Sequence, residues 1–553
     1  MSKAKHTAAA IGVIGVLMIS QARAESADSA ATEIALLKKQ LRLMEEKLDK
    51  LQKQTTANTE AAADAKAKAD DAKAKADTVK ADSARARSDS AKAISVANAN
   101  AALPVKAPVP HLDAVVHMPN NRPTICTADE RNCVSITSRV HFDVGGYDYH
   151  PNSPFTNPQK LDNGVNVRRA RIGVLGKFFE DWNYGLVYDF GGTSDGFGGT
   201  GAVGPAPGTP VGFLPGSAVS GIENAYLTYT GFKPFGGKLS LEIGVMDVPY
   251  TLDEATSSND MVFMERASSG IIAQNIAAGD FRSAVGARWY TDTLWIGGWA
   301  TGPTTGAVHS YSSVIPNGMT EQVGAAARAA VQVVSGNDYS VHIGGDAQWL
   351  IRAPRNTVTG AQTLTLSDRP ELRLDPTTLI STGALAGVSG AQVYSVEAAA
   401  TWGPLYLQGE YFWFDVDRRN NPVPLSSVKF EGGYAQAAFA LTGETRKYNP
   451  ASASYGYLVP KNPFSLDGSG WGAWEIAGRV SMMDLNDQPG LANGIAGGRQ
   501  LVYTVALNWY VNRNVRFMFN YLHGDVARQL TATNFTDAGS KFDAFAMRTQ
   551  VAF

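Results

Sequence analysis

The feature that most constrains the fold is a period-two alternation that starts at Val134 and recurs to the C-terminus. Alternation places successive side chains on opposite faces of a strand. A soluble β-sandwich also alternates, but here the polar face carries many charges and the apolar face often ends in aromatic residues, as in the girdles of a membrane barrel. The clearest apolar sets are Val134, Ile136, Val140, Phe142 and Val144; Trp182, Tyr184, Leu186, Tyr188 and Phe190; Leu501, Tyr503, Val505, Leu507 and Trp509; and Phe517, Phe519 and Tyr521.

The connections between these segments alternate in length. Short breaks are expected at 180–181, 233–237, 291–293, 335–338, 403–404 and 512–514. Long polar connections are expected near 149–165, 193–218, 248–280, 303–321, 353–390, 417–428, 483–499 and 527–542. Alternation of short turns with long loops is typical of outer-membrane barrels and predicts about sixteen antiparallel strands. The one exception is a long segment at 442–471, where a short turn was due.

The last expected strand ends the chain. Phe545, Met547, Val551 and Phe553 share one face, and Arg548 lies on the other. A terminal Phe on an amphipathic strand resembles the assembly signal of bacterial outer-membrane proteins. No stretch after the N-terminus is long and apolar enough for a membrane helix, so a chain like this could cross a membrane only as a closed barrel.

The N-terminus has the pattern of a secretory signal peptide. A basic start precedes a short apolar run from Ala8 to Ile19, and Ala22-Arg23-Ala24 forms a small-x-small cleavage site before Glu25. The apolar run is too short for a membrane-spanning helix. We therefore expect residues 1–24 to be a signal peptide that is removed.

Residues 25–100 are expected to form a periplasmic coiled-coil stalk. Large apolar residues recur at spacings of three and four and form a heptad seam, which favours self-association; they are Ile34, Leu37, Leu41, Met44, Leu48 and Leu51. Alanines continue the register over 60–100, where a disordered charged spacer is an equal alternative. Pro104, Pro108 and Pro110 then begin a Pro-rich linker over 101–133.

The linker contains Cys126 and Cys133, the two cysteines of the chain. In an exported protein, such a pair is expected to close a small disulfide loop. His111 and His117 do not make a zinc-ligand spacing with them. We therefore predict no metal site and no cofactor.

Charge and motifs argue against two function classes. The 49 Lys and Arg residues nearly balance 51 Asp and Glu residues, which argues against nucleic-acid binding. The eight histidines are scattered and no nucleophile motif is present, so we do not expect an enzyme.

The barrel segment, 134–553, resembles the phosphate-selective porin O/P family of Gram-negative bacteria. The resemblance rests on short motifs in a consistent order: 167–171 with 177 and 181–182, 255–258, 264–266, 369–371, 381–383, 441–444 with 446, 472–475, 507–510 and 548–553. It implies a homotrimer of 16-stranded barrels in the outer membrane, each narrowed by an inward-folded loop. By position, that loop should be the third long connection, about 248–280.

The family motifs carry over a set of pore-lining or anion-binding candidates. They are Arg139, Arg168, Arg169, Arg266 and Arg369, with Ser257 and Ser258 as hydroxyl donors. An anion-selective pore needs fixed positive charge at its narrowest point, and arginine stays charged and binds phosphate oxygens in a fork. Arg168 is one residue out of phase with Arg169, so we expect it less strongly at the pore.

Two positions depart from the phosphate-specific pattern. Glu254 replaces a lysine, and Ser367-Asp368 precede Arg369 where the family carries a further arginine. Residues 134–553 hold 29 Lys and Arg against 35 Asp and Glu residues. We therefore expect an outer-membrane porin through which small solutes diffuse. The family resemblance implies that these solutes are anions such as phosphate. The alternative is a structural stalked barrel that links the outer membrane to peptidoglycan.

Overall fold

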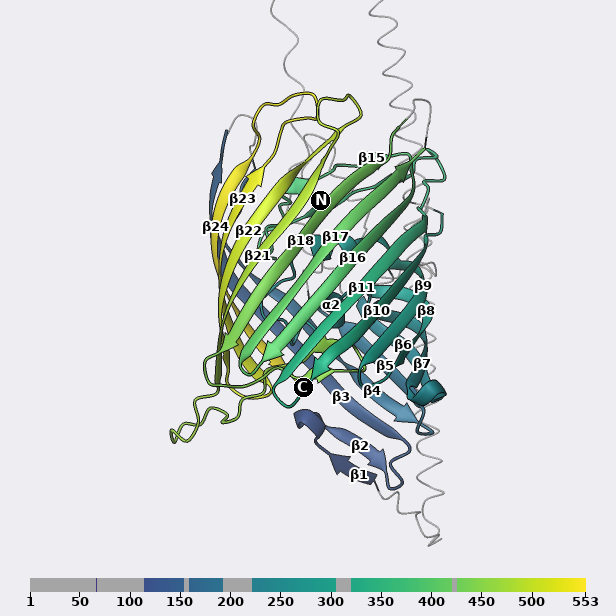
Figure 1. Cartoon of the computed structure of the whole chain (residues 1–553), viewed down its shortest axis with the longest axis vertical. Helices are drawn as coiled ribbons and strands as arrows, with labels where there is room; N and C mark the ends of the chain where they lie inside the picture. Colours follow the sequence, from purple (N-terminus) through teal and green to yellow (C-terminus); the bar gives the residue numbers. More distant parts are fainter. Residues whose placement is uncertain (1–65, 67–113, 154–158, 192–220, 305–319, 420–424) are drawn as a thin grey trace, which may run out of the picture. The chain divides into compact units, whose positions relative to one another are not determined.

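The computed structural model describes Lys66 and residues 114–153, 159–191, 221–304, 320–419 and 425–553 (Figure 1). The chain divides into Met1–Pro110 and His111–Phe553, and all the described residues except Lys66 belong to the second unit. The expected signal peptide, the coiled-coil seam and the 193–218 loop lie outside the described residues. Within the described part, no helix is long and apolar enough to span a membrane.

Sixteen antiparallel strands in the described residues form a closed barrel, which confirms the predicted strand number and class (Figure 1). The strands are β3 (Cys133–Pro151), β4 (Gly164–Phe178), β5 (Trp182–Asp189), β6 (Gly221–Phe232), β7 (Lys238–Val248), β8 (Gly279–Tyr290), β9 (Leu294–Thr304), β10 (Val323–Ser335), β11 (Tyr339–Arg352), β16 (Val388–Trp402), β17 (Leu405–Arg418), β18 (Val428–Ala440), β21 (Ala473–Asp487), β22 (Ile495–Tyr510), β23 (Val515–Ala527) and β24 (Ser540–Ala552). Each strand pairs with its neighbour along the chain. The last strand, β24, pairs with the first, β3, from Ala552–Arg139 to Ser540–Pro151, and this pairing closes the barrel.

A short hairpin extends the sheet beyond the start of the barrel. It consists of β1 (Ala114–His117), the 3-10 turn η1 (Pro119–Asn121) and β2 (Thr124–Thr127), and β2 pairs with β3. Cys126 and Cys133 are joined by a disulfide across this pairing, with their Cα atoms 4.1 Å apart. The later part of the expected linker, residues 114–127, therefore forms a hairpin that pairs with the start of β3.

The alternation predicted from the sequence separates the outer face of the barrel from the inner face. Along β3, Val140, Phe142 and Val144 are exposed, whereas His141 and Asp143 between them are buried. Burial is thus inverted relative to a soluble protein, because the apolar side chains face outward. An exposed apolar band on a closed barrel is what contact with lipid requires.

The connections differ between the two ends of the barrel. One end has short turns, among them residues 179–181, 291–293, 336–338 and 403–404, and the 3-10 turn η2 (Pro234–Gly236). The last residue, Phe553, lies at this end, where its backbone bonds that of Ser138 in both directions at 3.0 Å. The long connections begin at the other end, as the loop-length pattern predicted.

Three connections fold into the barrel. The first, 249–278, contains α2 (Leu252–Ala255) and α3 (Ser268–Ala277), and α3 contacts strands on several sides of the barrel, including β8, β11, β17 and β21. The second, 353–387, contains the two-residue strands β12 (Thr363–Leu364), β13 (Ser367–Asp368), β14 (Ile380–Ser381) and β15 (Leu385–Ala386). The third, 441–472, contains β19 (Tyr448–Asn449) and β20 (Ser454–Tyr455) and starts from the short-turn end.

The outward-facing residues provide a test of the barrel orientation. Ile243 is in the middle of β7 and 58% exposed, so Ile243→Arg should lower the free energy of unfolding by about 2–4 kcal/mol in lipid vesicles. Val334→Arg, near the short-turn end of β10, is the matched control. It should lower the free energy of unfolding by about 1 kcal/mol or less, because a charge near the membrane interface costs less than one at the midplane. Urea titration of the refolded variants measures both. Equal costs at the two positions would contradict the assigned membrane depth.

Candidate functional site: the constriction inside the barrel

The 249–278 connection is fixed to the inner face of the barrel at its first helix. Thr251 caps α2 by accepting a hydrogen bond from Glu254 N at 3.0 Å. The Glu410 carboxylate of β17 accepts from Leu252 N at 2.8 Å and from Asp253 N at 3.1 Å. The free backbone amides at a helix start favour a carboxylate. The start of the loop is thereby held against β17.

The 353–387 connection holds the second helix of that loop. The Glu371 carboxylate accepts from Ser268 N at 2.9 Å, from Arg479 of β21 at 2.7 Å and from Ser481 at 2.6 Å. One buried carboxylate therefore joins α3, the 353–387 connection and the barrel wall.

The 441–472 connection meets the loop from the opposite end of the barrel. Arg328 of β10 donates to Ser452 O at 2.9 Å and Ala453 O at 2.7 Å, and Ser454 Oγ donates to Ala255 O at 3.1 Å. This segment was the exception in the alternation of loop lengths. Its length is explained in part because Ser452, Ala453 and Ser454 pack inside the barrel, whereas later residues such as Leu466 remain exposed.

A β-bulge sets the orientation of the arginines on β4. His141 of β3 pairs with Arg169, and the next residue, Phe142, pairs with Val167, so Arg168 is an extra residue in the strand. A bulge of this kind shifts the alternation by one position. Arg168 and Arg169 are therefore both buried inside the barrel, and the expectation that Arg168 would be out of phase with the pore does not hold.

Arg168 joins an ion network with the inward loop. Its Nε and Nη2 donate to the two Glu265 oxygens at 2.9 and 3.1 Å. Arg548 of β24 donates to Glu265 at 2.6 Å and to both oxygens of Asp143 at 2.6 Å. Arg169 differs, because its buried Nε and Nη1 have no hydrogen-bond partner among the described residues.

Arg139 and Arg369, two further arginines predicted from the sequence, lie in different parts of the barrel interior. Arg139 of β3 donates to Ser258 Oγ at 2.6 Å and to Ser257 Oγ at 3.1 Å, which brings the predicted hydroxyl donors against a predicted arginine. Arg369 is half-buried on the 353–387 connection and interacts electrostatically with Tyr147 of β3.

Arg266 is held within the loop by acidic partners. Its Nε lies 3.3 Å from Glu254 Oε2 and 3.6 Å from Asp253 Oδ2, and it donates to Thr256 O at 3.0 Å. All four residues are buried. Glu254 therefore offsets the charge of the arginine that the sequence pattern placed at the pore.

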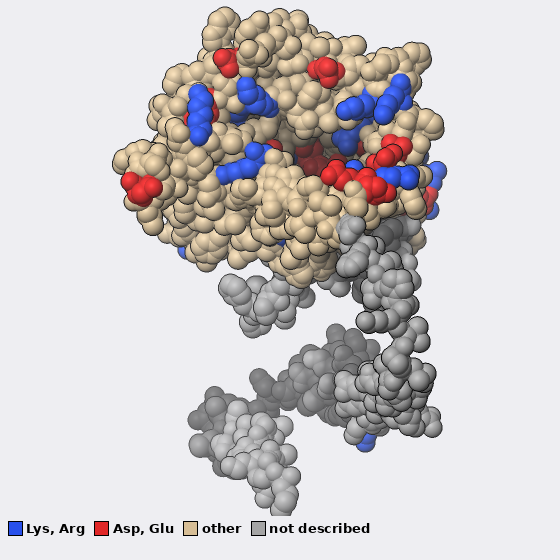
Figure 2. All heavy atoms as spheres, turned by 90° about the horizontal axis from the view of Figure 1, so that it is seen from below, with Lys and Arg blue, Asp and Glu red and all other residues tan. Residues whose placement is uncertain are grey.

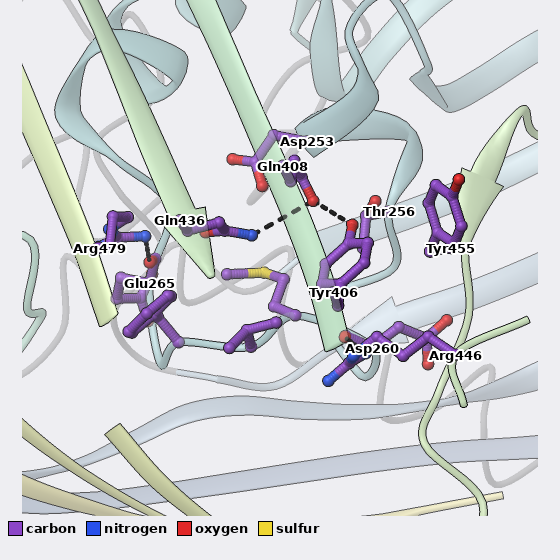
Figure 3. Close-up of a pocket in the computed structure, with 13 residues that line it drawn as sticks. Asp253, Thr256, Asp260, Glu265, Tyr406, Gln408, Gln436, Arg446, Tyr455 and Arg479 are labelled. Carbon is purple, nitrogen blue, oxygen red and sulfur yellow. Dashed lines mark hydrogen bonds between the residues drawn. The ribbon is translucent and has the colours of Figure 1, made fainter. Parts of the chain in front are cut away.

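A small polar cavity lies between the loop and the strands that face it (Figure 3). Its volume is about 10 Å³, space for about one water molecule. Gln436 donates to Gln408 at 3.2 Å, and Arg479 donates to the Glu265 carbonyl at 2.9 Å. Asp253 and Asp260 contribute acidic groups from the loop. Figure 2 shows charged side chains of both signs around a central hollow at the Phe553 end of the barrel.

Sequence reasoning missed most of the acidic partners. Glu265, Glu371, Glu397, Glu410 and Glu475 are all buried in or against the barrel wall. The signal that could have found the last three was their inward phase along β16, β17 and β21. Glu265 and Glu371 lie on irregular loops, where no periodicity predicts direction.

The loop carboxyl groups differ in their proton affinity. Burial alone would raise the pKa of the Glu265 carboxyl, but Arg168 and Arg548 outweigh it and hold that pKa well below its usual range. Burial raises the pKa of the Asp260 carboxyl, although Arg446 acts in the opposite direction. Glu265 therefore stays ionised and neutralises part of the arginine cluster.

Comparison with known proteins gives consistent matches over the barrel. The family model described as phosphate-selective porin O and P matches residues 134–553. Porin O of Pseudomonas aeruginosa is 24% identical over 438 residues, which cover 78% of this chain and 90% of porin O. An uncharacterized protein of Caulobacter vibrioides is 32% identical over 181 residues, 33% of each chain. A solved anion-selective porin from Comamonas acidovorans covers 76% of this chain and 100% of its own, at 11% identity and a TM-score of 0.41.

The Glu265 network yields a prediction for stability. Glu265→Gln removes the carboxylate shared by Arg168 and Arg548, and breaking such a buried pair should cost about 3 kcal/mol of unfolding free energy. The low pKa of Glu265 in the folded protein means that its stabilisation is lost only as pH falls through that lowered value. The difference between variant and wild type should therefore be undiminished at pH 5.

Urea titration at pH 8 and pH 5 measures this difference. Asp484→Asn is the control, because Asp484 lies on β21 and, within the described residues, accepts hydrogen bonds only from Asn486. A Glu265→Gln protein as stable as wild type would show that the network does not hold the loop.

Proposed function

The chain belongs to the phosphate-selective porin O and P family, and from that premise we propose that it is an outer-membrane channel through which small anions, phosphate among them, diffuse passively. The observation that carries the anion preference is Arg169. It is 2% exposed on the inner face of the barrel, and two of its guanidinium nitrogens have no hydrogen-bond partner in the described part of the chain. A buried donor without a partner favours an incoming acceptor.

Arg139 supports the same proposal with a second donor group. Its guanidinium lies against the hydroxyls of Ser257 and Ser258 on the inward loop. Arginine and hydroxyl donors together suit the oxygens of a phosphate or a similar oxyanion. We propose Arg139, Arg168, Arg169, Arg266 and Arg369, with Ser257 and Ser258, as the residues that attract anions, and Glu254 as the residue that weakens the attraction.

The buried acidic residues argue against strict phosphate specificity. Among the described residues, fifteen Asp and Glu side chains are buried, against eleven Arg side chains. Most of the buried arginines, including Arg168, Arg266 and Arg479, are already in ion pairs. An oxyanion therefore meets few uncompensated positive charges along the barrel.

Single-channel recording tests the proposal as a whole. The purified protein in a planar bilayer should conduct, and a KCl gradient should give a reversal potential of the sign for anions. Added phosphate should reduce the chloride current if both ions share the Arg169 region. A structural barrel that only links the outer membrane to the cell wall would conduct little, and a cation-selective current would overturn the anion preference.

Two substitutions locate the selectivity. Glu254→Lys should shift the channel toward anions, and Arg266→Ala should shift it toward cations, because the two side chains form one ion pair. A unit charge a few ångströms from a passing ion contributes on the order of 1–4 kcal/mol, roughly a tenfold or larger change in relative permeability. Reversal potentials measure both. If neither variant moves the potential, the constriction lies at another loop.

We further propose that the protein is a homotrimer whose stalk lies in the periplasm. The heptad seam within residues 31–54 supports self-association, and Leu41 and Leu48 belong to that seam. The double variant Leu41→Asp/Leu48→Asp should therefore lose cross-links between stalks while the barrel still conducts. Lys39→Asp, outside the seam, is the control. Unchanged cross-linking would remove the coiled-coil assignment, but would leave the barrel proposal in place.

A further inference from the structure

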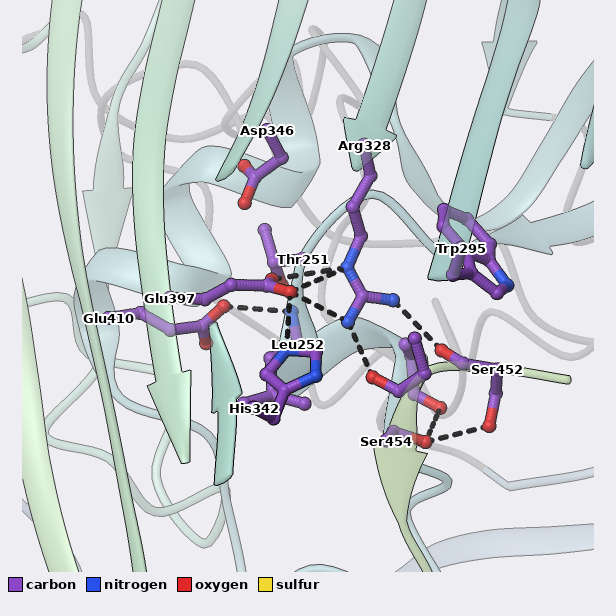
Figure 4. Close-up of polar contacts among 12 residues, drawn as sticks. Thr251, Leu252, Trp295, Arg328, His342, Asp346, Glu397, Glu410, Ser452 and Ser454 are labelled. Atoms are coloured by element: carbon purple, nitrogen blue, oxygen red, sulfur yellow. Dashed lines mark hydrogen bonds and ion pairs between the residues drawn. The ribbon is translucent and has the colours of Figure 1, made fainter. Parts of the chain in front are cut away.

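Three carboxylates meet on the inner face of the barrel, on the wall formed by β11, β16 and β17 (Figure 4). Asp346, Glu397 and Glu410 each place a carboxylate oxygen within 4.8 Å of the others, and their side chains are 8%, 3% and 4% exposed. Glu397 and Glu410 are direct cross-strand partners. Like charges in this position repel, so the pairing needs a positive group between or beside them.

The arginine at this wall, Arg328, already forms an ion pair with Glu397. Arg328 donates through Nε and Nη2 to Glu397, which also bonds His342 Nε2 at 2.8 Å. Within the described residues, Asp346 and Glu410 make no ion pair with an Arg or Lys. The three carboxyl groups therefore outnumber the cationic side chains that contact them in the described residues.

Hydrogen bonding leaves free acceptor capacity at the cluster. Glu410 accepts from Leu252 N, Asp253 N and Tyr434 Oη, which uses three of its four lone-pair positions. Asp346 accepts through Oδ1 from Ser395 Oγ. Its Oδ2 is buried and has no hydrogen-bond partner among the described residues.

A second buried polar group lies beside the same carboxylates. The Tyr250 side chain is fully buried and interacts electrostatically with Asp346 and Glu410. Its hydroxyl has no well-aligned hydrogen-bond partner within the described part of the chain, and Gln348 is the polar side chain that lies close to it. A buried carboxylate oxygen and a buried hydroxyl with unused hydrogen-bonding capacity at an acidic cluster favour a bound group there.

The donor set defines the class of that group. Carboxylate and hydroxyl oxygens are the ligands of hard divalent cations. Ca²⁺ accepts six to eight oxygen ligands in a flexible geometry, whereas Mg²⁺ loses its water reluctantly and is seldom held by protein oxygens alone. A site built from three carboxylates of the barrel wall therefore favours Ca²⁺.

We propose that Asp346, Glu397 and Glu410 bind one Ca²⁺ ion on the inner face of the barrel. This acidic cluster is distinct from the arginines of β4, Arg168 and Arg169. The ion would offset negative charge on the three carboxyl groups. Because Glu410 also holds the amides of Leu252 and Asp253, bound Ca²⁺ would fix the start of the inward loop. This site is additional to the proposed anion path and does not depend on it.

Calcium binding by the full-length protein tests the proposal directly. Protein refolded from inclusion bodies, which is free of lipopolysaccharide, and treated with EDTA should bind one ⁴⁵Ca²⁺ per chain in equilibrium dialysis. Mg²⁺ should compete at least tenfold more weakly. Because no current is measured, a negative result here says nothing about whether the channel conducts.

Isosteric variants assign the ion to the cluster. Asp346→Asn keeps the acceptor for Ser395 but removes a charge, and should weaken Ca²⁺ binding at least tenfold. Glu410→Gln is a second variant with the same expectation. Asp375→Asn is the matched control, because Asp375 is buried, accepts from the amides of Asp162 and Thr377, and lies outside the cluster.

The outcomes separate cleanly. Loss of binding in either folded cluster variant, with normal binding in Asp375→Asn, supports the site. Absence of saturable binding to the wild-type protein overturns it, as does equal binding to the cluster variants. If neither cluster variant folds, Tb³⁺ emission excited through the protein's aromatic residues decides the matter with wild-type protein. Tb³⁺ should luminesce and be displaced by Ca²⁺, and failure of either effect overturns the site.

Discussion

The structure depends on the pairing of its last strand with its first. In the hydrocarbon of a membrane no water is available for backbone amides and carbonyls, so an open sheet edge costs several kcal/mol for each unpaired group. The hydrogen bonds between β24 and β3 remove both edges. Closure also fixes which face of every strand is inside, and the polar side chains consequently face one enclosed volume.

That enclosed volume is narrowed by three connections rather than by strand side chains alone. The 249–278 loop is held at α2 by Glu410 and at α3 by Glu371, and the 441–472 segment meets it from the opposite end. The anchors at Glu410 and Glu371 pair a carboxylate with backbone amides among buried side chains, where such hydrogen bonds are strong. The constriction is therefore a set of charge-paired contacts between segments distant in sequence.

The charge pairing has a functional consequence. In Arg168, Arg266 and Arg328 the guanidinium is directed at a carboxylate, so most positive charge in the barrel is neutralised locally. Two nitrogens of Arg169 have no hydrogen-bond partner in the described residues, because the bulge at Arg168 turns both side chains inward and Arg168 makes the hydrogen bonds to Glu265. A one-residue irregularity in β4 thus decides which arginine keeps guanidinium nitrogens for the anion contact that we propose.

The sequence by itself determined the strand number, the outward apolar face and the positions of the short turns, because period-two alternation and loop length are local properties. It also identified the family and the arginines of the motifs. It could not determine where the side chains of irregular segments point, so the inward course of 441–472 and the role of Glu371 were not foreseen. The bulge at Arg168 depends on its register with β3, and the approach of Asp346 to Glu397 and Glu410 depends on the pairing of three strands. Such contacts exist only once the barrel has closed, and only the tertiary structure decided them.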